Sequence, residues 1–144
     1  MKIIFTLFLC AFFSFNLFGQ TEQNQPASPP DVAELSLARD DGNGDFGEET
    51  KMFSPNDIPI HCSVLFDRPG AVAVKMEVVA VKAEGLKPDS KIVKVSFKTG
   101  DEDNRVNFKA SPAKVWHVGR YRVDIFLDGK LAQSADFEVV GTAK

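Results

Sequence analysis

The chain has 144 residues, of which 44% are hydrophobic and 26% charged, and these are the proportions of one globular domain. Its 17 Lys and Arg residues are outnumbered by 20 Asp and Glu residues, so the formal net charge is −3. That balance argues against a general affinity for the nucleic-acid backbone, and we expect no nucleic-acid partner. Two cysteines exclude a disulfide-rich scaffold and a four-thiolate zinc site.

Residues 1–19 have the pattern of a secretory signal peptide. Six of the 13 Phe residues lie within the first 18 positions, in an apolar run that follows Lys2 and ends near Gly19. We expect cleavage after Gly19, and therefore a secreted or periplasmic protein without stable membrane insertion. An uncleaved anchor is the alternative, because Leu17 stands where a small residue is preferred. A lipid anchor on Cys10 is disfavoured, because no small residue precedes it.

Residues 20–33 are rich in Pro and Gln and contain no aromatic side chain. Such a segment cannot bury enough apolar surface to offset the entropy lost on ordering, so a flexible tether or a simple unstructured end is expected. After removal of the signal peptide, Cys62 is the sole cysteine. The following domain, residues 34–144, must therefore fold without an internal disulfide.

From Glu34 onward apolar and polar residues alternate with period two, which is typical of strands with one buried face. A first strand is expected over residues 34–38. The later inward rows are Ile58, Ile60, Cys62, Val64 and Phe66; Val72, Val74, Met76, Val78 and Ala80; Val93, Val95 and Phe97; Val106 and Phe108; Tyr121, Val123, Ile125 and Leu127; and Leu131, Ala135, Phe137 and Val139.

Turn residues separate these rows, and Asp128-Gly129 in particular indicates a tight hairpin, because this pair tolerates the positive φ angles of such a turn. No helical period of useful length follows residue 33. Seven or eight short strands with frequent turns predict an all-β fold, an antiparallel two-sheet sandwich.

The segment around Tyr121 resembles the entry to strand F of immunoglobulin-like and fibronectin-type-III-like domains of secreted bacterial proteins. Gly119 and Tyr121 match the glycine and the corner tyrosine of that pattern, and Val123 stands where the second cysteine would be. Cys62 would take the position of the first cysteine, so the resemblance implies a divergent domain without the inter-sheet disulfide. It also implies structural roles for Cys62, Gly119, Tyr121 and Val123, and it says nothing about function.

No catalytic residues are predicted. Cys62 shares its face with Ile60 and Val64, so a buried and unreactive thiol is expected. His61 points to the opposite face from Cys62, so the two are poorly placed to share a metal. Neither His61 nor His117 lies near a Gly-x-Ser-x-Gly nucleophile motif. A hydrolase is therefore the least favoured of the functions considered.

The run from Asp40 to Glu49 is the most unusual polar segment of the chain. Its oxygen-bearing side chains suggest calcium ligands, with Asp40, Asp41, Asn43 and Asp45 as the candidates. The helix–loop–helix template does not fit, because Phe46 and Met52 occupy the positions of its Gly and Glu. A solvated, glycine-rich connection is the alternative, and it requires no cofactor.

Four residues near the last strands form the candidate partner-binding surface: Trp116, Arg120, Arg122 and Phe126. The last three share one outward row, and surfaces that mix aromatic and Arg side chains are typical of partner or sugar sites. In the alternative, Phe126 is covered and Trp116 fills a corner of the domain. We therefore expect an exported, non-enzymatic module that acts in protein binding, with another envelope or secreted protein as partner, or in envelope or extracellular assembly. A small calcium- or carbohydrate-binding module is the alternative.

Overall fold

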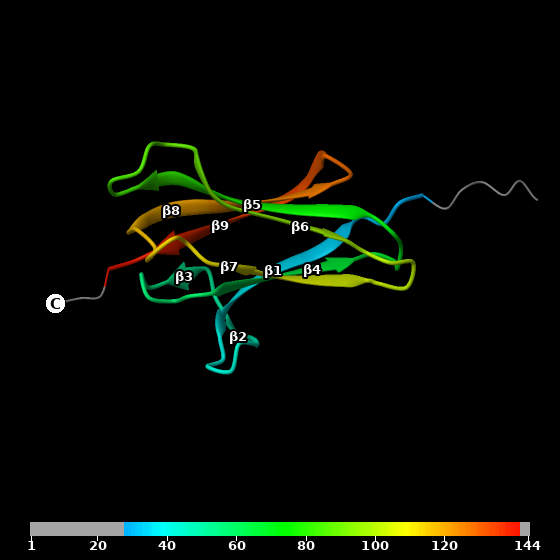
Figure 1. The fold of residues 1–144 in the computed structure, drawn as a ribbon, viewed down its shortest axis with the longest axis horizontal. Coiled ribbons are helices and arrows are strands. Elements are labelled where there is room, and N and C mark those ends of the chain that lie inside the picture. Colours follow the sequence, from blue (N-terminus) through cyan, green and yellow to red (C-terminus); the bar gives the residue numbers. More distant parts are fainter. Residues whose placement is uncertain (1–27, 142–144) are drawn as a thin grey trace, which may run out of the picture.

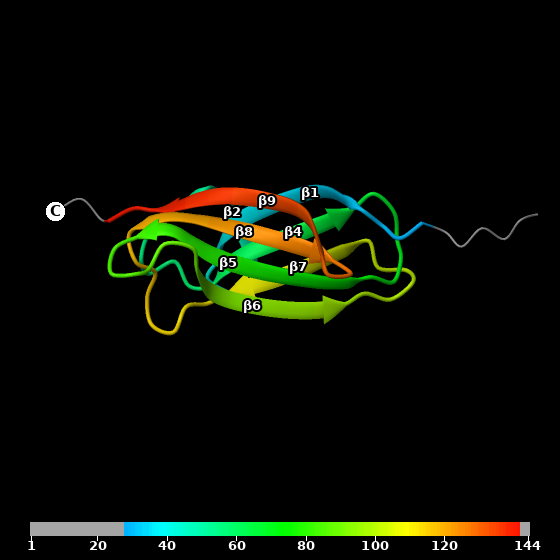
Figure 2. The same ribbon diagram turned by 90° about the horizontal axis from the view of Figure 1, so that it is seen from above.

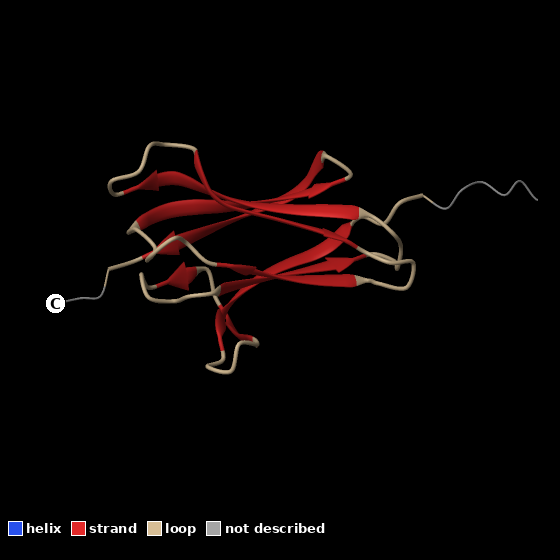
Figure 3. Cartoon of the chain, viewed as in Figure 1, coloured by secondary structure: helices blue, strands red, loops and turns tan. Residues whose placement is uncertain are grey.

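The computed structural model describes residues 28–141, which consist of strands, turns and loops (Figure 3). The predicted signal peptide, Cys10 and most of the predicted tether lie outside these residues. Within residues 28–141, no helix has the length and apolar character needed to cross a membrane.

Four strands form the first sheet, in the order β2-β1-β4-β7. They span Val32–Asp40 (β1), Phe46–Glu49 (β2), Ile60–Phe66 (β4) and Arg105–Ala110 (β7). All the pairings in this sheet are antiparallel. Strand β4 occupies a central position, with Leu37 and Phe108 flanking Cys62 from its two neighbours.

Five strands form the second sheet, in the order β3-β9-β8-β5-β6. They span Met52–Phe53 (β3), Ala73–Ala83 (β5), Ser90–Lys98 (β6), Gly119–Leu127 (β8) and Lys130–Val139 (β9). The pairings are antiparallel except that the short β3 runs parallel to β9. Figure 1 shows the two sheets stacked face to face, with the β1–β2 hairpin projecting from the outer side of the four-stranded sheet.

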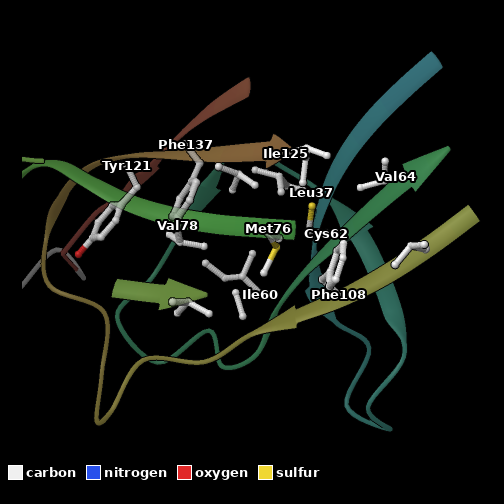
Figure 4. Close-up of a cluster of buried hydrophobic side chains, with 14 of the residues drawn as sticks. Leu37, Ile60, Cys62, Val64, Met76, Val78, Phe108, Tyr121, Ile125 and Phe137 are labelled. Atoms are coloured by element: carbon white, nitrogen blue, oxygen red, sulfur yellow. The ribbon is translucent and has the colours of Figure 1, made fainter. Parts of the chain in front are cut away.

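The core lies between the two sheets and is built mainly from the predicted inward rows (Figure 4). Three residues predicted to point inward, Ile58, Phe97 and Leu131, are exposed, and the buried Phe53 and Trp116 come from outside those rows. On β8, for example, Tyr121, Val123 and Ile125 are at most 1% exposed, because alternate residues of a strand point to the same face. The all-β sandwich predicted from the period-two pattern is confirmed. The predicted hairpin is also present, since Asp128 and Gly129 have φ values of 48° and 84°.

The structure differs from the expected elements at the N-terminal side of the domain. Strand β1 begins at Val32, two residues before the predicted start, and it is anchored there by a hydrogen bond from the Asp31 amide to the Asp67 carboxylate. Strands β2 and β3 were not predicted. Each is too short, four and two residues, to show a period-two pattern of its own.

Candidate binding surfaces

The outward row of β8 lies on the outer face of the five-stranded sheet, and its residues Arg122 and Asp124 are paired with each other. The Arg122 guanidinium donates from Nε to Asp124 Oδ1 at 2.7 Å and from Nη2 to Asp124 Oδ2 at 3.0 Å. The Ser134 hydroxyl on β9 donates to the same carboxylate at 2.6 Å. The Lys75 ammonium lies 4.3 Å from the centre of the Phe126 ring. The charged groups of Arg122, Asp124 and Lys75 on this face therefore already have partners within the domain.

A second carboxylate on the same face, Glu77 of β5, is 2% exposed. The Lys75 Nζ lies 3.2 Å from Glu77 Oε1, and the Nζ of Lys91 on β6 lies 3.1 Å from Glu77 Oε2. Burial raises the pKa of the Glu77 carboxyl, but hydrogen bonds and charge from Lys91 and Lys75 outweigh burial, so its pKa lies below its ordinary value. Burial likewise raises the pKa of the Asp124 carboxyl, but the hydrogen bonds from Arg122 and Ser134, with the charges of Arg122 and Lys91, outweigh burial and hold that pKa below its ordinary value.

Because the pKa values of these two carboxyl groups are lowered in the folded protein, we expect the domain to lose stability in acid. A group whose pKa is lower in the folded protein binds fewer protons there than in the unfolded chain. Its contribution is therefore complete above the ordinary values of 3.8 for Asp124 and 4.5 for Glu77, and it is lost as the pH falls below them. We expect the melting temperature to fall between about pH 5 and pH 2. In Asp124→Asn the fall should be shallower, and an unchanged slope would contradict the assignment.

Beside this network the sheet surface is hollowed into a groove of about 610 Å³, which we call the outer groove. It spans the β3, β9, β8 and β5 strands near the start of β8. Its lining residues are Lys51, Met52, Val81, Arg120, Tyr121, Arg122, Asp136, Phe137 and Glu138. Arg120 is exposed, and Met52 is 54% exposed. The outer groove therefore contains two of the four predicted partner-binding residues, Arg120 and Arg122.

The prediction of Trp116 as a surface residue is wrong, because its side chain is 1% exposed. The indole packs edge-to-face on Tyr121 and Phe137, with ring centres 5.6 and 6.0 Å away. Its Nε1 donates to the Asp57 carbonyl at 2.9 Å. Trp116 thus fills the corner of the domain, as in the alternative interpretation, and cannot offer a face to a sugar or a partner. Phe126 is half-buried beneath Lys75 and does not line the outer groove.

Sequence reasoning missed Lys51, Met52 and Glu138 as parts of the outer groove. Met52 lies opposite Glu138 in the parallel β3–β9 pair, and Glu138 lies opposite Arg120 in the β9–β8 pair. Only these pairings bring the three residues together. No sequence pattern marked this place, because the 54% exposure of Met52 is seen only in the folded structure.

The residues singled out for structural roles meet at the β8 entry and in the core. The Tyr121 hydroxyl donates to the His117 carbonyl at 2.7 Å, which is the bond expected of a corner tyrosine. Gly119 lies so close to β5 that a Cβ would be 2.8 Å from the Ala83 Cβ. Val123 and Cys62 are both 1% exposed and belong to the same core, one from each sheet.

Burial raises the pKa of the Cys62 thiol to about 12. The thiolate is the reactive form, so we expect Cys62 to resist a thiol reagent such as dithionitrobenzoate in the native protein. In the chain that starts at Gln20, where Cys62 is the only thiol, reaction should begin only as guanidinium unfolds the domain. Rapid stoichiometric labelling in buffer would contradict this prediction.

The candidate calcium residues form a hairpin tip whose carboxylates bind protein groups instead of pointing to one centre. Asp40 Oδ1 accepts the Gly42 and Gly44 amides, and its Oδ2 lies 2.8 Å from His61 Nε2. Asp41 Oδ1 accepts the Asn43 and Asp45 amides. Within residues 28–141, no three side chains of His, Cys, Asp or Glu are grouped as metal ligands. The geometry therefore offers the calcium prediction no support.

The histidines occupy unrelated places. His61 points away from Cys62, as predicted, but it is 2% exposed because Asp40 and Phe46 of the β1–β2 hairpin cover it. The Asp40 pKa is held below its ordinary value, mainly by the hydrogen bond to His61. His117 is exposed at the β8 entry.

Comparison with known proteins bears on the fold. No protein-family model matches the chain, and no curated protein matches it. Among solved structures, an immunoglobulin-like protein from Pseudomonas aeruginosa is similar with a TM-score of 0.51 at 14% identity. The similarity covers 78% of this chain and 98% of that one. The chain has an immunoglobulin-like β-sandwich fold.

Two larger proteins contain a segment of lower similarity. One is an alkylpurine DNA glycosylase from Pseudomonas fluorescens, with a TM-score of 0.46 and 17% identity, and the other a β-glucosidase from Bifidobacterium adolescentis, with a TM-score of 0.46 and 14% identity. Each similarity covers 78% of this chain, which spans only 30% and 17% of the length of those two chains.

Proposed function

We propose that this immunoglobulin-like domain is an exported, non-enzymatic module that binds another secreted or envelope protein through the outer groove. The observation that carries the proposal is the groove itself, about 610 Å³ in volume and lined by Met52, Arg120 and Arg122. Met and Arg are enriched at protein interfaces, where a long apolar stem and a charged head both find partners. The signal-like residues 1–19 support export.

The groove also has a rigid base. Arg122 is fixed in place by its two hydrogen bonds to Asp124, a residue that is 6% exposed. A partner therefore meets a guanidinium whose conformation is already restricted, and less side-chain entropy is lost on binding. Arg120 and Lys51, in contrast, are exposed and make no ion pair within residues 28–141, so either can pair with an acidic residue of the partner.

The test is site-specific photocrosslinking in the source cell. A photoreactive residue replaces Met52, which is 54% exposed in the groove, or Leu131, which is 59% exposed at the β8–β9 hairpin and serves as the matched control. We expect a crosslinked protein at position 52 that is absent at position 131 and is lost when Arg120→Glu is added. Equal crosslinking at both positions, or none at position 52, would overturn the proposal.

Export is tested separately by removing residues 1–19. We expect the full chain outside the cytoplasm and the shortened chain inside it, as judged by fractionation and immunoblotting. The same location for both chains would refute the signal-peptide assignment without bearing on the groove.

A further inference from the structure

On the side of the sandwich where β6 and β7 lie, both sheets end in strands that have no further neighbour (Figure 2). Among the described residues β6 pairs only with β5, and β7 pairs only with β4. The outer edge of the nine-residue β6 therefore presents backbone N–H and C=O groups without a strand partner. An edge of this kind can accept an additional strand.

Between the two edge strands lies a groove of about 390 Å³, which we call the edge groove. Its apolar residues are Val95 and Phe97 of β6 and Val106 and Phe108 of β7. Phe97 lies opposite the buried Val74 and so shares its core-facing side, yet Phe97 is 52% exposed. The phenyl ring faces the space between the sheets, and within residues 28–141 no further strand of that sheet lies beyond β6 to cover it.

The two edge strands are positively charged. Strands β6 and β7 carry five cations and no Asp or Glu, although the whole chain has a net charge of −3. Lys91 is committed to Glu77, and Arg105 donates to the Ser63 hydroxyl. Lys94 and Lys98 are exposed and make no ion pair within residues 28–141. The one acid lining the edge groove is Asp103, whose carboxylate accepts the Gly100 amide.

We propose that the edge groove binds an extended peptide segment of a protein partner, in which apolar and acidic residues alternate, as an added strand on β6. On such a strand one set of side chains enters the groove beside Phe97, and the other set lies on the outer face beside Lys94 and Lys98. The alternation follows because Phe97 and Lys98 are neighbours in sequence and point to opposite faces. This surface is distinct from the outer groove and does not depend on it.

The probe is an octapeptide in which Val and Glu alternate. Its binding is measured from NMR chemical-shift changes in the purified protein. Expected is a saturable shift of the amides of β6 and β7. A peptide with the same sequence, N-methylated at alternate residues on its pairing edge, should not bind, because it cannot donate the strand hydrogen bonds. Equal binding of the methylated peptide, or no binding of either, would overturn the proposal.

Charge reversal tests the recognition. The double variant Lys94→Glu, Lys98→Glu should bind the Val–Glu octapeptide at least about tenfold more weakly and should gain binding of the matching Val–Lys octapeptide. The control Lys87→Glu, Lys130→Glu makes the same change in net charge at exposed positions away from the groove and should bind like the unmodified protein. Phe97→Ser should also weaken binding, while Arg120→Glu in the outer groove should leave it unchanged.

Two further outcomes would overturn the peptide-strand proposal. If the control variant loses as much affinity as the Lys94 and Lys98 variant, only net charge matters and no strand site exists. If heparin shifts the same amides and displaces the octapeptide regardless of Phe97, the surface binds polyanions rather than a peptide strand. Unchanged melting temperatures of the variants exclude unfolding as the cause of any loss.

Discussion

Replacing Trp116 by alanine is expected to destabilise the domain by about 3–5 kcal/mol, the range for removal of a buried aromatic side chain. The indole is 1% exposed and contacts the rings of Tyr121 and Phe137, which come from β8 and β9. Its loss leaves a cavity at the corner of the core and removes the hydrogen-bond donor of the Asp57 carbonyl. Denaturant unfolding followed by circular dichroism measures the change.

The neighbouring Val115→Ala is the control, since Val115 is 44% exposed and should change the stability by less than about 0.5 kcal/mol. Trp116→Phe is expected to fall between the two, because it keeps a ring in the corner but loses the bond to Asp57. A Trp116→Ala protein as stable as the unmodified one would mean that the indole lies outside the core.

Gly119→Ala is expected to destabilise the domain by about 3 kcal/mol or more, although it adds a single methyl group. Gly119 begins β8 with φ of 154° and lies opposite Ala83 of β5. A Cβ there would collide with the Lys82 carbonyl oxygen and the Ala83 Cα, which are backbone atoms held in the sheet. The strands would have to separate at the position that leads into Tyr121.

Gly42→Ala separates this collision from simple backbone strain. Gly42 has φ of 92°, but a Cβ there meets no atom within 4 Å. Its substitution should therefore cost only the conformational penalty, about 1–2 kcal/mol. If both variants lost the same stability in thermal unfolding, the close approach of β5 and β8 at Gly119 would be refuted.

The proposed surfaces place two kinds of binding on one small sandwich. The outer groove lies on a sheet face, where Arg122 is already fixed by Asp124. The edge groove lies between two edge strands, β6 and β7, where Phe97 is exposed and Lys94 and Lys98 make no ion pair within residues 28–141. Because the residues that line the two grooves do not overlap, either site can fail in its test without affecting the other.

The sequence alone determined most of the strands that form the core, although β3, which contributes the buried Phe53, was not predicted. Period-two alternation depends only on which residues must leave water, so the inward residues of β8, such as Val123 and Ile125, were predicted correctly. The Asp128-Gly129 turn was also predictable, because the positive φ angles at both positions are a local property of these residue types.

The tertiary structure decided what the surface residues do. Arg122 and Trp116 both looked available for binding in the sequence. In the structure Arg122 donates to Asp124, which also accepts from Ser134. The Trp116 indole is enclosed by Asp57, Tyr121 and Phe137. The edge position of Phe97 likewise depends on the order of strands in each sheet. Alternation assigns a face to each residue. Which other segment covers that face is set by contacts between residues far apart in the chain.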